Sequence, residues 1–396
     1  MNVVNLPRWF FVAVSFCSLI APASARAADC GVEKWTERTS TISPWLRDAA
    51  FGGGRFVAAG DQGLMLISSD GGTTWQRRWH DAAVYFARVS FANGQFFATG
   101  RKYGTTPFDW EGLLWSSADG LNWQPRYTET NTVVLGVAHG AGRYVAVAVN
   151  APLSASTRAL TSLDGVQWTA ATIPGNGWLY DIAAGNDVFV AVGGNRIMRS
   201  TDGANWQPSA PPGASSLQSV VFFNGQFIAV GDGGQILSSP SGEVWTARVS
   251  GTMSFLAAVA AGAGIVVAGG NDGVILSSLD GVSWTQRYVP GLNVRGLAFG
   301  ADVFAAAGRY GTVYQSGGVS TCSGPRLSIR PGSPPQIDLF GNVGASYNIE
   351  FSDALGAPEG WQFLQQLPPL PAGPYTFSDP NSSPTGNRFY RAVLIP

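Results

Sequence analysis

Few residues in this chain have the types and spacing that catalysis requires. Asp48 and Asp181 occupy equivalent positions in two similar segments, and both are expected to point inward. Acid–base cleavage of a glycosidic bond needs two carboxyl groups that face one pocket. The two histidines, His80 and His139, lie in turn-like segments, where a surface role is the simpler interpretation. A hydrolase or lyase would have these candidates: Asp48, Asp181 or Asp109, with Arg47, Arg88 and Arg295.

Metal or cofactor chemistry is not expected. Transition-metal sites in proteins are built from clustered Cys, His and carboxylate side chains. The sequence holds three cysteines and two histidines, and its spacing brings no such cluster together. We therefore predict neither a metal nor a cofactor, and a non-catalytic protein is favoured over an enzyme.

The composition excludes several classes of protein. Only 12% of the 396 residues are charged and 45% are hydrophobic, whereas about a quarter of a soluble domain is usually charged. Such a chain can bury a large core and is not intrinsically disordered. Lys and Arg number 24 against 25 Asp and Glu, giving a formal charge of −1. This balance offers no basic surface for nucleic acid or anionic lipid.

The first 27 residues are typical of a secretory signal peptide. Arg8 is followed by an apolar run from Trp9 to Ile20 and then by small residues up to Ala27, after which we expect cleavage. No later run of about 20 apolar residues exists that could span a membrane. The protein is therefore expected to be exported and to reside in the periplasm, at the cell surface or outside the cell.

A turn sequence of the form Ser-x-Asp-Gly-x-x-Trp recurs along the chain. Its six tryptophans are Trp75, Trp123, Trp168, Trp206, Trp245 and Trp284, a period near 40 residues that is typical of propeller blades. The Asp can accept backbone N–H groups across the turn while the Trp packs between sheets, so we assign both to the fold. Ser241 replaces Asp in one copy. The predicted structural aspartates are Asp70, Asp119, Asp164, Asp202 and Asp280.

Each repeat contains four short alternating apolar runs separated by hairpin signals. One unit reads 218–223, 226–230, 235–239 and 244–248, with Asn224-Gly225 in the first turn. Asn-Gly supplies the positive φ values of tight hairpins. The sequence therefore predicts an all-β fold, a seven-bladed β-propeller. Its innermost strands begin near Trp45, Tyr85, Val133, Trp178, Ser216, Phe255 and Asn293.

The last repeat has three strands and is completed, we expect, from the N-terminus. Residues 33–37 resemble the Trp-containing fourth strand of the other repeats, and their docking would remove an exposed sheet edge. Cys30 and Cys322 fall where the absent covalent turn would lie, so a disulfide between them is predicted. Two free thiols remain the alternative. The propeller is expected to span residues 28–322.

The repeated Ser-x-Asp-Gly-x-x-Trp turn resembles the Asp-box of sialidases and related glycosidases. Residues 30–322 look like the Asp-box propellers of the photosystem II assembly and stability factor type, which implies a propeller fold. Sialidases also need an arginine cluster, a Tyr–Glu nucleophile pair and an Asp acid, and the family places an Arg-Ile-Pro-like motif before its first box. No such motif precedes Ser68. The resemblance therefore argues against glycosidase activity.

Residues 323–396 form a linker and a second unit with a different composition. They are rich in Pro, lack the repeated turn and contain alternating runs such as 347–352 and 388–393. These runs predict a small β-sandwich. It is similar to an immunoglobulin- or fibronectin-III-like module, which implies an accessory or attachment role without a defined ligand.

The start of each innermost strand predicts a binding surface at the mouth of the central channel. An aliphatic position, Leu46 in the first repeat, is flanked by residues that alternation would turn toward the mouth. Irregular insertions at 101–111 and 150–158 lie on the same rim. Aromatic and Arg side chains favour peptide or glycan binding, although rings that only fill a narrow channel are the alternative. The candidate binding residues are Trp45, Arg47, Tyr85, Arg88, Trp110, Trp178, Tyr180 and Arg295.

Three functions remain open from the sequence. The first is an exported, non-catalytic propeller that binds a protein segment or a glycan at this rim. The second is a glycoside hydrolase or lyase of the sialidase-like type. The third is a structural component of an envelope or matrix. The oligomeric state is not predicted.

Overall fold

The computed structural model describes residues 32–39, 44–106, 109–150, 156–209, 213, 215–319, 326–330, 336–340, 346–352, 362–370, 375–380 and 389–395. The described residues fall into two compact units, Val32–Gly318 and the part from Val319 onward. The expected signal peptide and both Cys30 and Cys322 lie outside the described residues.

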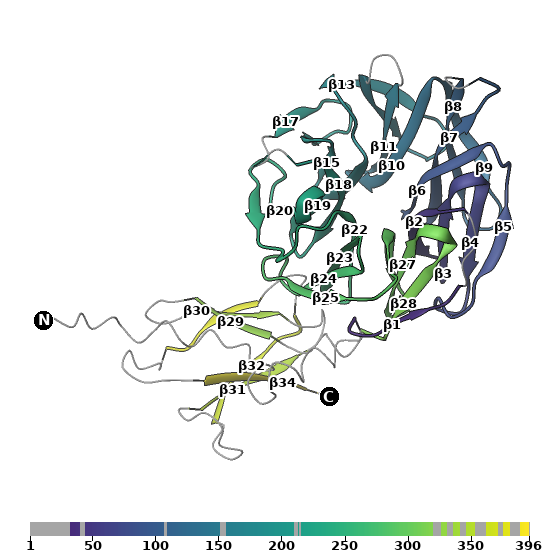
Figure 1. Cartoon of the computed structure of the whole chain (residues 1–396). Coiled ribbons are helices and arrows are strands. Elements are labelled where there is room, and N and C mark those ends of the chain that lie inside the picture. Colours follow the sequence, from purple (N-terminus) through teal and green to yellow (C-terminus); the bar gives the residue numbers. More distant parts are fainter. Residues whose placement is uncertain are drawn as a thin grey trace, which may run out of the picture. The chain divides into compact units, whose positions relative to one another are not determined.

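The first unit consists of four-stranded antiparallel sheets, seven among the described residues, and its strands pair in chain order within each sheet except in the last (Figure 1). We number the sheets 1 to 7 by their first strands. These are β2 (Leu46–Gly52), β6 (Val84–Ala92), β10 (Thr132–Gly140), β14 (Asp181–Gly185), β18 (Leu217–Phe223), β22 (Leu256–Gly262) and β26 (Val294–Gly300).

The remaining strands follow in the same sheet order. The second strands are β3 (Arg55–Gly60), β7 (Gln95–Tyr103), β11 (Arg143–Asn150), β15 (Val188–Gly193), β19 (Gln226–Gly231), β23 (Ile265–Gly270) and β27 (Val303–Gly308). The third are β4 (Leu64–Ser68), β8 (Trp110–Ser117), β12 (Ser156–Ser162), β16 (Arg196–Ser200), β20 (Ile236–Ser239), β24 (Val274–Ser278) and β28 (Val313–Ser316). The fourth are β5 (Gln76–Trp79), β9 (Gln124–Thr130), β13 (Thr169–Asn176), β17 (Gln207–Ser209), β21 (Thr246–Arg248), β25 (Thr285–Tyr288) and β1 (Trp35–Glu37).

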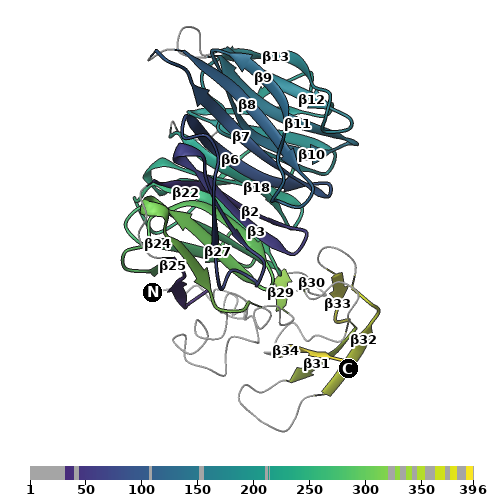
Figure 2. The same ribbon diagram turned by 90° about the vertical axis from the view of Figure 1, so that its right-hand side faces the viewer.

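In sheet 1 the second and third strands are the most buried, and the fourth strand is the most exposed. Five of the six residues of β3 are buried, and all four residues of β5 are exposed. Strands covered on both faces read as continuous apolar runs, because neither face meets water. Figure 2 shows the four strands β6 to β9 of sheet 2 lying side by side in this order. Tight hairpins join the first two strands, as at Asn93 and Gly94, whose φ values are 44° and 83°.

The sheets are arranged around a common axis, as a β-propeller requires. The first strands contact one another in the order β2, β6, β10, β14, β18, β22 and β26, and β26 in turn contacts β2. No helix among the described residues has the length and hydrophobicity to cross a bilayer. The all-β propeller class predicted from the repeat is confirmed.

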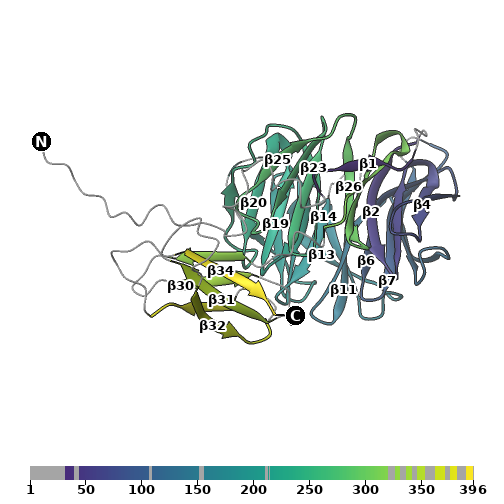
Figure 3. The same cartoon turned by 90° about the horizontal axis from the view of Figure 1, so that it is seen from below.

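The N-terminal strand completes sheet 7, as the sequence predicted. β1 pairs antiparallel with β28, with Trp35 opposite Ser316 and Glu37 opposite Tyr314 (Figure 1). Figure 3 shows β1 and β26 of the same sheet from below. The Nε of Arg38 donates to Gln315 Oε1 at 2.6 Å. Sheet 7 therefore combines strands from both ends of the first unit.

The repeated turns hold the third and fourth strands together. In sheet 4, Asp202 Oδ1 accepts the hydroxyl of Ser200 at 3.0 Å and the backbone N–H of Asn205 at 2.7 Å. The indole of Trp206 donates to the carbonyl of Gly203 at 2.9 Å. These hydrogen bonds, led by the backbone N–H of Asn205, lower the pKa of Asp202. The same Ser-to-Asp hydrogen bond forms at Asp70, Asp119, Asp164 and Asp280.

The second unit contains two three-stranded sheets with a shared apolar core. One has the order β29 (Arg326–Arg330), β30 (Gln336–Phe340), β33 (Tyr375–Ser378), and the other β32 (Gln362–Leu367), β31 (Tyr347–Ser352), β34 (Phe389–Leu394). Their core includes Ile337, Tyr347 and Phe377. The buried hydroxyl of Tyr390 donates to Asp379 Oδ2 at 2.9 Å.

Candidate functional site at the channel mouth

The two ends of the propeller sheets differ in the connections they carry. In sheet 1, Gly52 pairs with Arg55 beside the first hairpin, and Leu46 pairs with Gly60 at the opposite end. The repeated Ser-Asp turns lie with the first hairpins, and we call that end the turn rim. The other end carries the starts of the first strands and the connections from each second strand to the third strand. We call these the second connections and this end the mouth.

One position near the mouth packs as the sequence predicted. An aliphatic or aromatic residue at the start of each first strand is fully buried between sheets, with an exposure of 0% in every sheet. These residues are Leu46, Phe86, Val134, Leu179, Leu217, Leu256 and Val294.

The neighbours of this position, such as Trp45 and Arg47, stack on each other, but the strands do not alternate regularly after it. The pairing register shifts between Leu46 and Asp48 in sheet 1, and at the matching place in sheets 2, 3, 5, 6 and 7. A β-bulge inserts one unpaired residue and redirects the side chains that follow it. Arg47 therefore occupies the bulge, and the residue after it turns into the channel.

An alternating series of arginines and aromatic rings covers the mouth over sheets 6, 7, 1 and 2. We call it the arginine ladder. It comprises Phe255, Arg295, Trp45, Arg309, Arg47, Tyr85, Arg101, Tyr103 and Trp110.

Stacking of guanidinium groups on rings connects the ladder. The Cζ of Arg47 lies 5.0 Å from the ring centre of Trp45 and 5.2 Å from that of Tyr85. The Cζ of Arg101 lies 5.1 Å from Tyr85 and 4.9 Å from Trp110. Rings within about 6 Å of a cation attract it through the negative face of the π system. The rings thus orient the guanidinium groups without neutralising them.

The ladder has more cations than anions to pair with them. Arg47 forms a two-point ion pair with Asp61, at 2.8 and 3.0 Å. Among the described residues no ion pair is formed by Arg101, Arg295 or Arg309, and the buried Nε atom of each has no hydrogen-bond partner. Burial, then the charges of Arg309 and Arg47, lower the pKa of Arg295. The guanidinium groups of the ladder can therefore donate hydrogen bonds to carboxylates.

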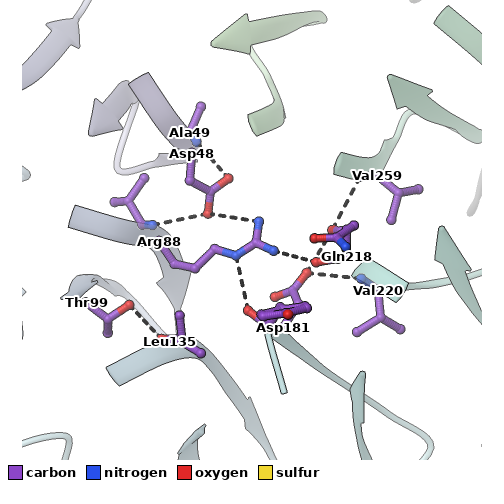
Figure 4. Close-up of polar contacts among 12 residues, drawn as sticks. Asp48, Ala49, Arg88, Thr99, Leu135, Asp181, Gln218, Val220 and Val259 are labelled. Atoms are coloured by element: carbon purple, nitrogen blue, oxygen red, sulfur yellow. Dashed lines mark hydrogen bonds and ion pairs between the residues drawn. The ribbon is translucent and has the colours of Figure 1, made fainter. Parts of the chain in front are cut away.

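Behind the mouth, three charged side chains cross the channel, and we call Asp48, Arg88 and Asp181 the channel cluster (Figure 4). The Nε of Arg88 donates to the carbonyl of Tyr180 at 3.3 Å, and its Nη2 donates to that of Gln218 at 2.5 Å. Its Nη1 lies 4.0 Å from Asp48 Oδ2. Arg88 extends from sheet 2 to sheets 4 and 5, so it fills the channel rather than joining the ladder.

The two carboxylates of the channel cluster tie neighbouring sheets together. Asp48 Oδ2 accepts the N–H of Val89 in sheet 2 at 3.2 Å, and Asp181 Oδ2 accepts that of Val220 in sheet 5 at 3.0 Å. Burial raises the pKa of Asp48 to about 7, Arg88 opposes this, and the charge of Asp181 adds to it. A Cβ on neighbouring Gly296 would lie 2.3 Å from the Cα of Asp48, so this contact requires glycine.

The two histidines considered for catalysis pack against aromatic rings. The ring of His80 packs against Phe86 and Trp115, with centres 5.9 and 5.5 Å apart, and burial lowers its pKa. His139 packs on Tyr144 at 4.6 Å. Within the described ranges no group of three His, Cys, Asp or Glu side chains is placed to hold a metal. A shallow depression in sheet 3 lies on the turn rim, beside the Ser162 turn, and not at the mouth.

Most of the predicted binding residues come together, but some ladder members were not predicted. Trp45, Arg47, Tyr85, Trp110 and Arg295 belong to the ladder, Arg88 lies in the channel cluster, and Trp178 and Tyr180 pack together at the mouth of sheet 4. The members that sequence reasoning did not select are Phe255, Arg101, Tyr103 and Arg309. Arg101 and Tyr103 lie in the last three residues of β7, where the predicted insertion 101–111 begins, and aligning the connections between second and third strands would have revealed Arg309.

Comparison with solved structures shows the propeller fold. The chain is 19% identical to YCF48 from Cyanidioschyzon merolae, with a TM-score of 0.54 over 72% of this chain and 98% of that chain. A structure described as YCF48 bound to D1 peptide matches with the same identity and TM-score, over 94% of its chain. A catalytically inactive virginiamycin B lyase from Staphylococcus aureus with quinupristin is 13% identical, with a TM-score of 0.60 over 72% and 99% of the two chains.

These similarities are in structure and do not assign the chain to a protein family. No protein-family model matches the sequence, and no curated protein matches it with significance. At these identities the comparisons establish the fold alone.

Proposed function

We propose that this chain is an exported, non-catalytic propeller that binds an acidic protein segment at its mouth through the arginine ladder. The observation that carries the proposal is the set of oriented guanidinium groups on Arg101, Arg295 and Arg309 that form no ion pair among the described residues, although Arg101 donates to the Tyr103 hydroxyl and Arg295 to Asn271 Oδ1. Charge-assisted hydrogen bonds to carboxylates are short and strong, and Arg matches a carboxylate with two parallel N–H groups. Acidic side chains in an extended segment would supply the acceptors that the ladder lacks.

Two further observations support binding at the mouth. The channel cluster fills the axis behind the ladder, so a segment would lie across the mouth instead of passing through it. YCF48, a propeller of similar fold, has a structure described as bound to a D1 peptide. Asp48 and Asp181 hold backbone N–H groups of adjacent sheets, which favours a structural role for both over acid–base catalysis.

The proposal includes the architecture around the site. Each four-stranded sheet is one blade of a closed, seven-bladed ring, and a Cys30–Cys322 disulfide joins its ends. The pairing of Trp35 with Ser316 supports this, because it brings both ends of the ring into one sheet. Residues 1–27 direct export, and residues 323–396 form an immunoglobulin-like sandwich with an accessory role. Mass mapping of the secreted protein tests the cleavage site and the disulfide.

Fluorescence anisotropy with a labelled peptide of alternating Glu and Ser tests the binding function. Wild-type protein should bind this peptide and not its Gln/Ser counterpart. The double variant Arg101→Gln/Arg309→Gln should lose about tenfold in affinity, equivalent to about 1.4 kcal/mol. Arg77→Gln/Arg78→Gln on exposed strand β5 removes the same charge elsewhere and should bind as wild type.

Three results would contradict the proposal. Equal losses in both double variants would mean that net charge alone attracts the peptide. Binding on a glycan panel that is lost in the double Trp178→Ala/Arg47→Ala variant, without peptide binding, would assign the mouth to glycans. Release of reducing sugar from a polysaccharide panel would favour a glycoside hydrolase.

A further inference from the structure

The second connections of three sheets carry different versions of one charged pair. Sheet 1 has Arg47 in the bulge and Asp61 at the start of η4 (Asp61–Gly63), joined by two hydrogen bonds. Sheet 7 has arginine at both equivalent positions, Arg295 and Arg309, the latter beginning η6 (Arg309–Gly311). The acid is thus absent from sheet 7, which leaves two cations there.

Sheet 5 has the opposite imbalance. Its η5 (Asp232–Gly234) begins with Asp232, equivalent to Asp61, but the bulge position holds Gln218 instead of arginine. Gln218 Nε2 reaches Asp232 Oδ1 at 3.3 Å. Among the described residues Asp232 forms no ion pair. The carboxylate therefore lacks the cation that its counterpart in sheet 1 possesses.

Two aromatic rings belong to the adjoining sheet 4, where Tyr180 and Gln218 of sheet 5 are joined because Arg88 donates to the carbonyls of both. The rings of Trp178 and Tyr180 in sheet 4 are 6.2 Å apart with an angle of 31° between their planes, and both are partly exposed. Burial, followed by the charge of Asp232, raises the pKa of Tyr180. Arg47 in sheet 1 is likewise held by a carboxylate and two rings, Trp45 and Tyr85. The same elements are present at sheets 4 and 5 without the cation.

The other charged groups near these residues do not supply a cation to Asp232. Arg88 donates to the carbonyls of Tyr180 and Gln218 from below, and two carboxylates, Asp48 and Asp181, balance its charge. Arg196 donates to the carbonyls of Pro174 and Gly177. The channel cluster carries a formal charge of −1 when both acids are ionised, which favours a cation above it.

We propose that Trp178, Tyr180 and Asp232 form a subsite for the ammonium or guanidinium group of a basic side chain. This inference rests on the proposed function, because the basic side chain belongs to the same segment whose acidic residues contact the ladder. The ligand cation would meet a carboxylate and the faces of two rings, as Arg47 does in sheet 1, although here Gln218 holds the Arg47 position and both rings come from sheet 4. The bound segment thus carries acidic and basic parts that fix its direction across the mouth.

A small probe tests the subsite without the ladder. The full protein is labelled with 5-fluorotryptophan, and the Trp178 resonance is assigned by ¹⁹F NMR with Trp178→Phe. Titration with Nα-acetyl-lysine methylamide should shift this resonance saturably, whereas the norleucine analogue, which lacks the amine, should not. Asp232→Asn should weaken the lysine response about fivefold, within the range of an ion pair combined with cation–π contact. Equal responses to both probes would overturn the inference.

A second variant distinguishes the subsite from a folding effect. Gln218→Arg restores the pair found in sheet 1, so it should abolish the lysine response while leaving the melting temperature unchanged or slightly higher. An undiminished response in folded Gln218→Arg would contradict the inference.

Peptides separate failure of the subsite from failure of the ladder. A Glu/Ser peptide extended by Gly-Ser and two lysines should bind wild type several-fold more tightly than the same peptide with Gln in place of Lys, and Asp232→Asn should remove only this difference. Equal binding of both peptides to wild type would overturn the subsite and preserve the ladder. Binding of neither, with the lysine probe still shifting Trp178, would overturn the proposed function and its link to the subsite.

Discussion

The two rims of the propeller unit use the same strands for different purposes. At the turn rim, Ser-to-Asp hydrogen bonds recur from sheet to sheet, as at Asp70 and Asp202, and the indoles seal neighbouring sheets. At the mouth, equivalent positions hold different residues: an Arg47–Asp61 pair, Gln218 with Asp232, or two arginines. Chemistry that repeats in every sheet stabilises the repeat, whereas chemistry that changes from sheet to sheet can recognise one partner.

The largest effect should separate the rims by stability. Trp206 at the turn rim is 5% exposed and hydrogen-bonded to Gly203, so Trp206→Ala should lower the free energy of unfolding by about 4 kcal/mol. Trp178→Ala at the mouth should cost about 1 kcal/mol and remove the response to lysine. Urea unfolding of both variants measures this. Similar losses at the two sites would break the comparison.

The pH dependence of stability should differ in sign between the channel cluster and the turn rim. The folded pKa of Asp48 is raised to about 7 by burial, so the folded state binds a proton that the unfolded state releases near pH 4. The free energy of unfolding should therefore fall as pH rises from about 4 to about 7, by up to about 1.4 kcal/mol per pH unit. Asp48→Asn should remove this decline, as measured by denaturant unfolding at several pH values.

The turn rim supplies the control for that measurement. Hydrogen bonds, led by that from the backbone N–H of Asn122, lower the pKa of Asp119. Stability from this group is present above its unfolded pKa of about 4 and is lost as the pH falls below it. Asp119→Asn should keep the decline between pH 4 and 7 and flatten the loss in acid. An unchanged decline in Asp48→Asn would show that another group is responsible.

Removing one positive charge should weaken peptide binding when the charge lies at the mouth, and should leave binding unchanged when it lies at the turn rim. Arg309→Gln is expected to weaken binding of the Glu/Ser peptide about threefold to tenfold, because one unpaired guanidinium is lost. Arg55→Gln at the turn rim, where Nη1 donates to the carbonyl of Asp119 at 3.5 Å, should bind as wild type. Isothermal titration calorimetry decides between them, and equal weakening would place the peptide elsewhere.

The smallest effect should come from repairing the turn of sheet 5. Ser241 stands where other sheets have Asp, and its hydroxyl accepts only the N–H of Glu243, at 3.3 Å. Ser241→Asp should accept further backbone N–H groups and stabilise the protein by about 0.5–1 kcal/mol. Thermal unfolding compares it with Ser241→Ala. A loss of stability would mean that this turn differs from the others in backbone geometry.

Repetition explains what could be predicted from the sequence. The Ser-Asp turns and the period near 40 predicted the propeller class, and the incomplete last repeat predicted that residues 33–37 would pair with its last strand, as β1 does with β28. Both depend on local hydrogen bonds and hairpins that leave a mark in residue type. The buried position of Leu46 followed from the same alignment.

The detailed site could not be predicted, because bulges and long side chains determine which residues lie at the mouth and which lie in the channel. A bulge after Leu46 or Phe86 has no residue signature here, so Arg88 was assigned to the rim although it crosses the channel. Arg309 belongs to the ladder through a turn whose equivalents hold Asp61 and Asp232. Comparing the turns position by position shows the charge imbalance in the sequence. Only the structure shows that the rings of Trp178 and Tyr180 pack together and that Arg88 joins Tyr180 to Gln218.

Photo-crosslinking tests the central claim that the mouth, and not the turn rim, binds an acidic segment. The Glu/Ser peptide carries a benzophenone group, and mass spectrometry locates its crosslinks on the purified protein. The account predicts crosslinks near Tyr103, Trp110 and Tyr310, the last of which lies in η6 with its ring centre 6.3 Å from that of Trp45. These products should be lost in Arg101→Gln/Arg309→Gln. Crosslinks concentrated in the Ser-Asp turns or in the second unit would contradict it.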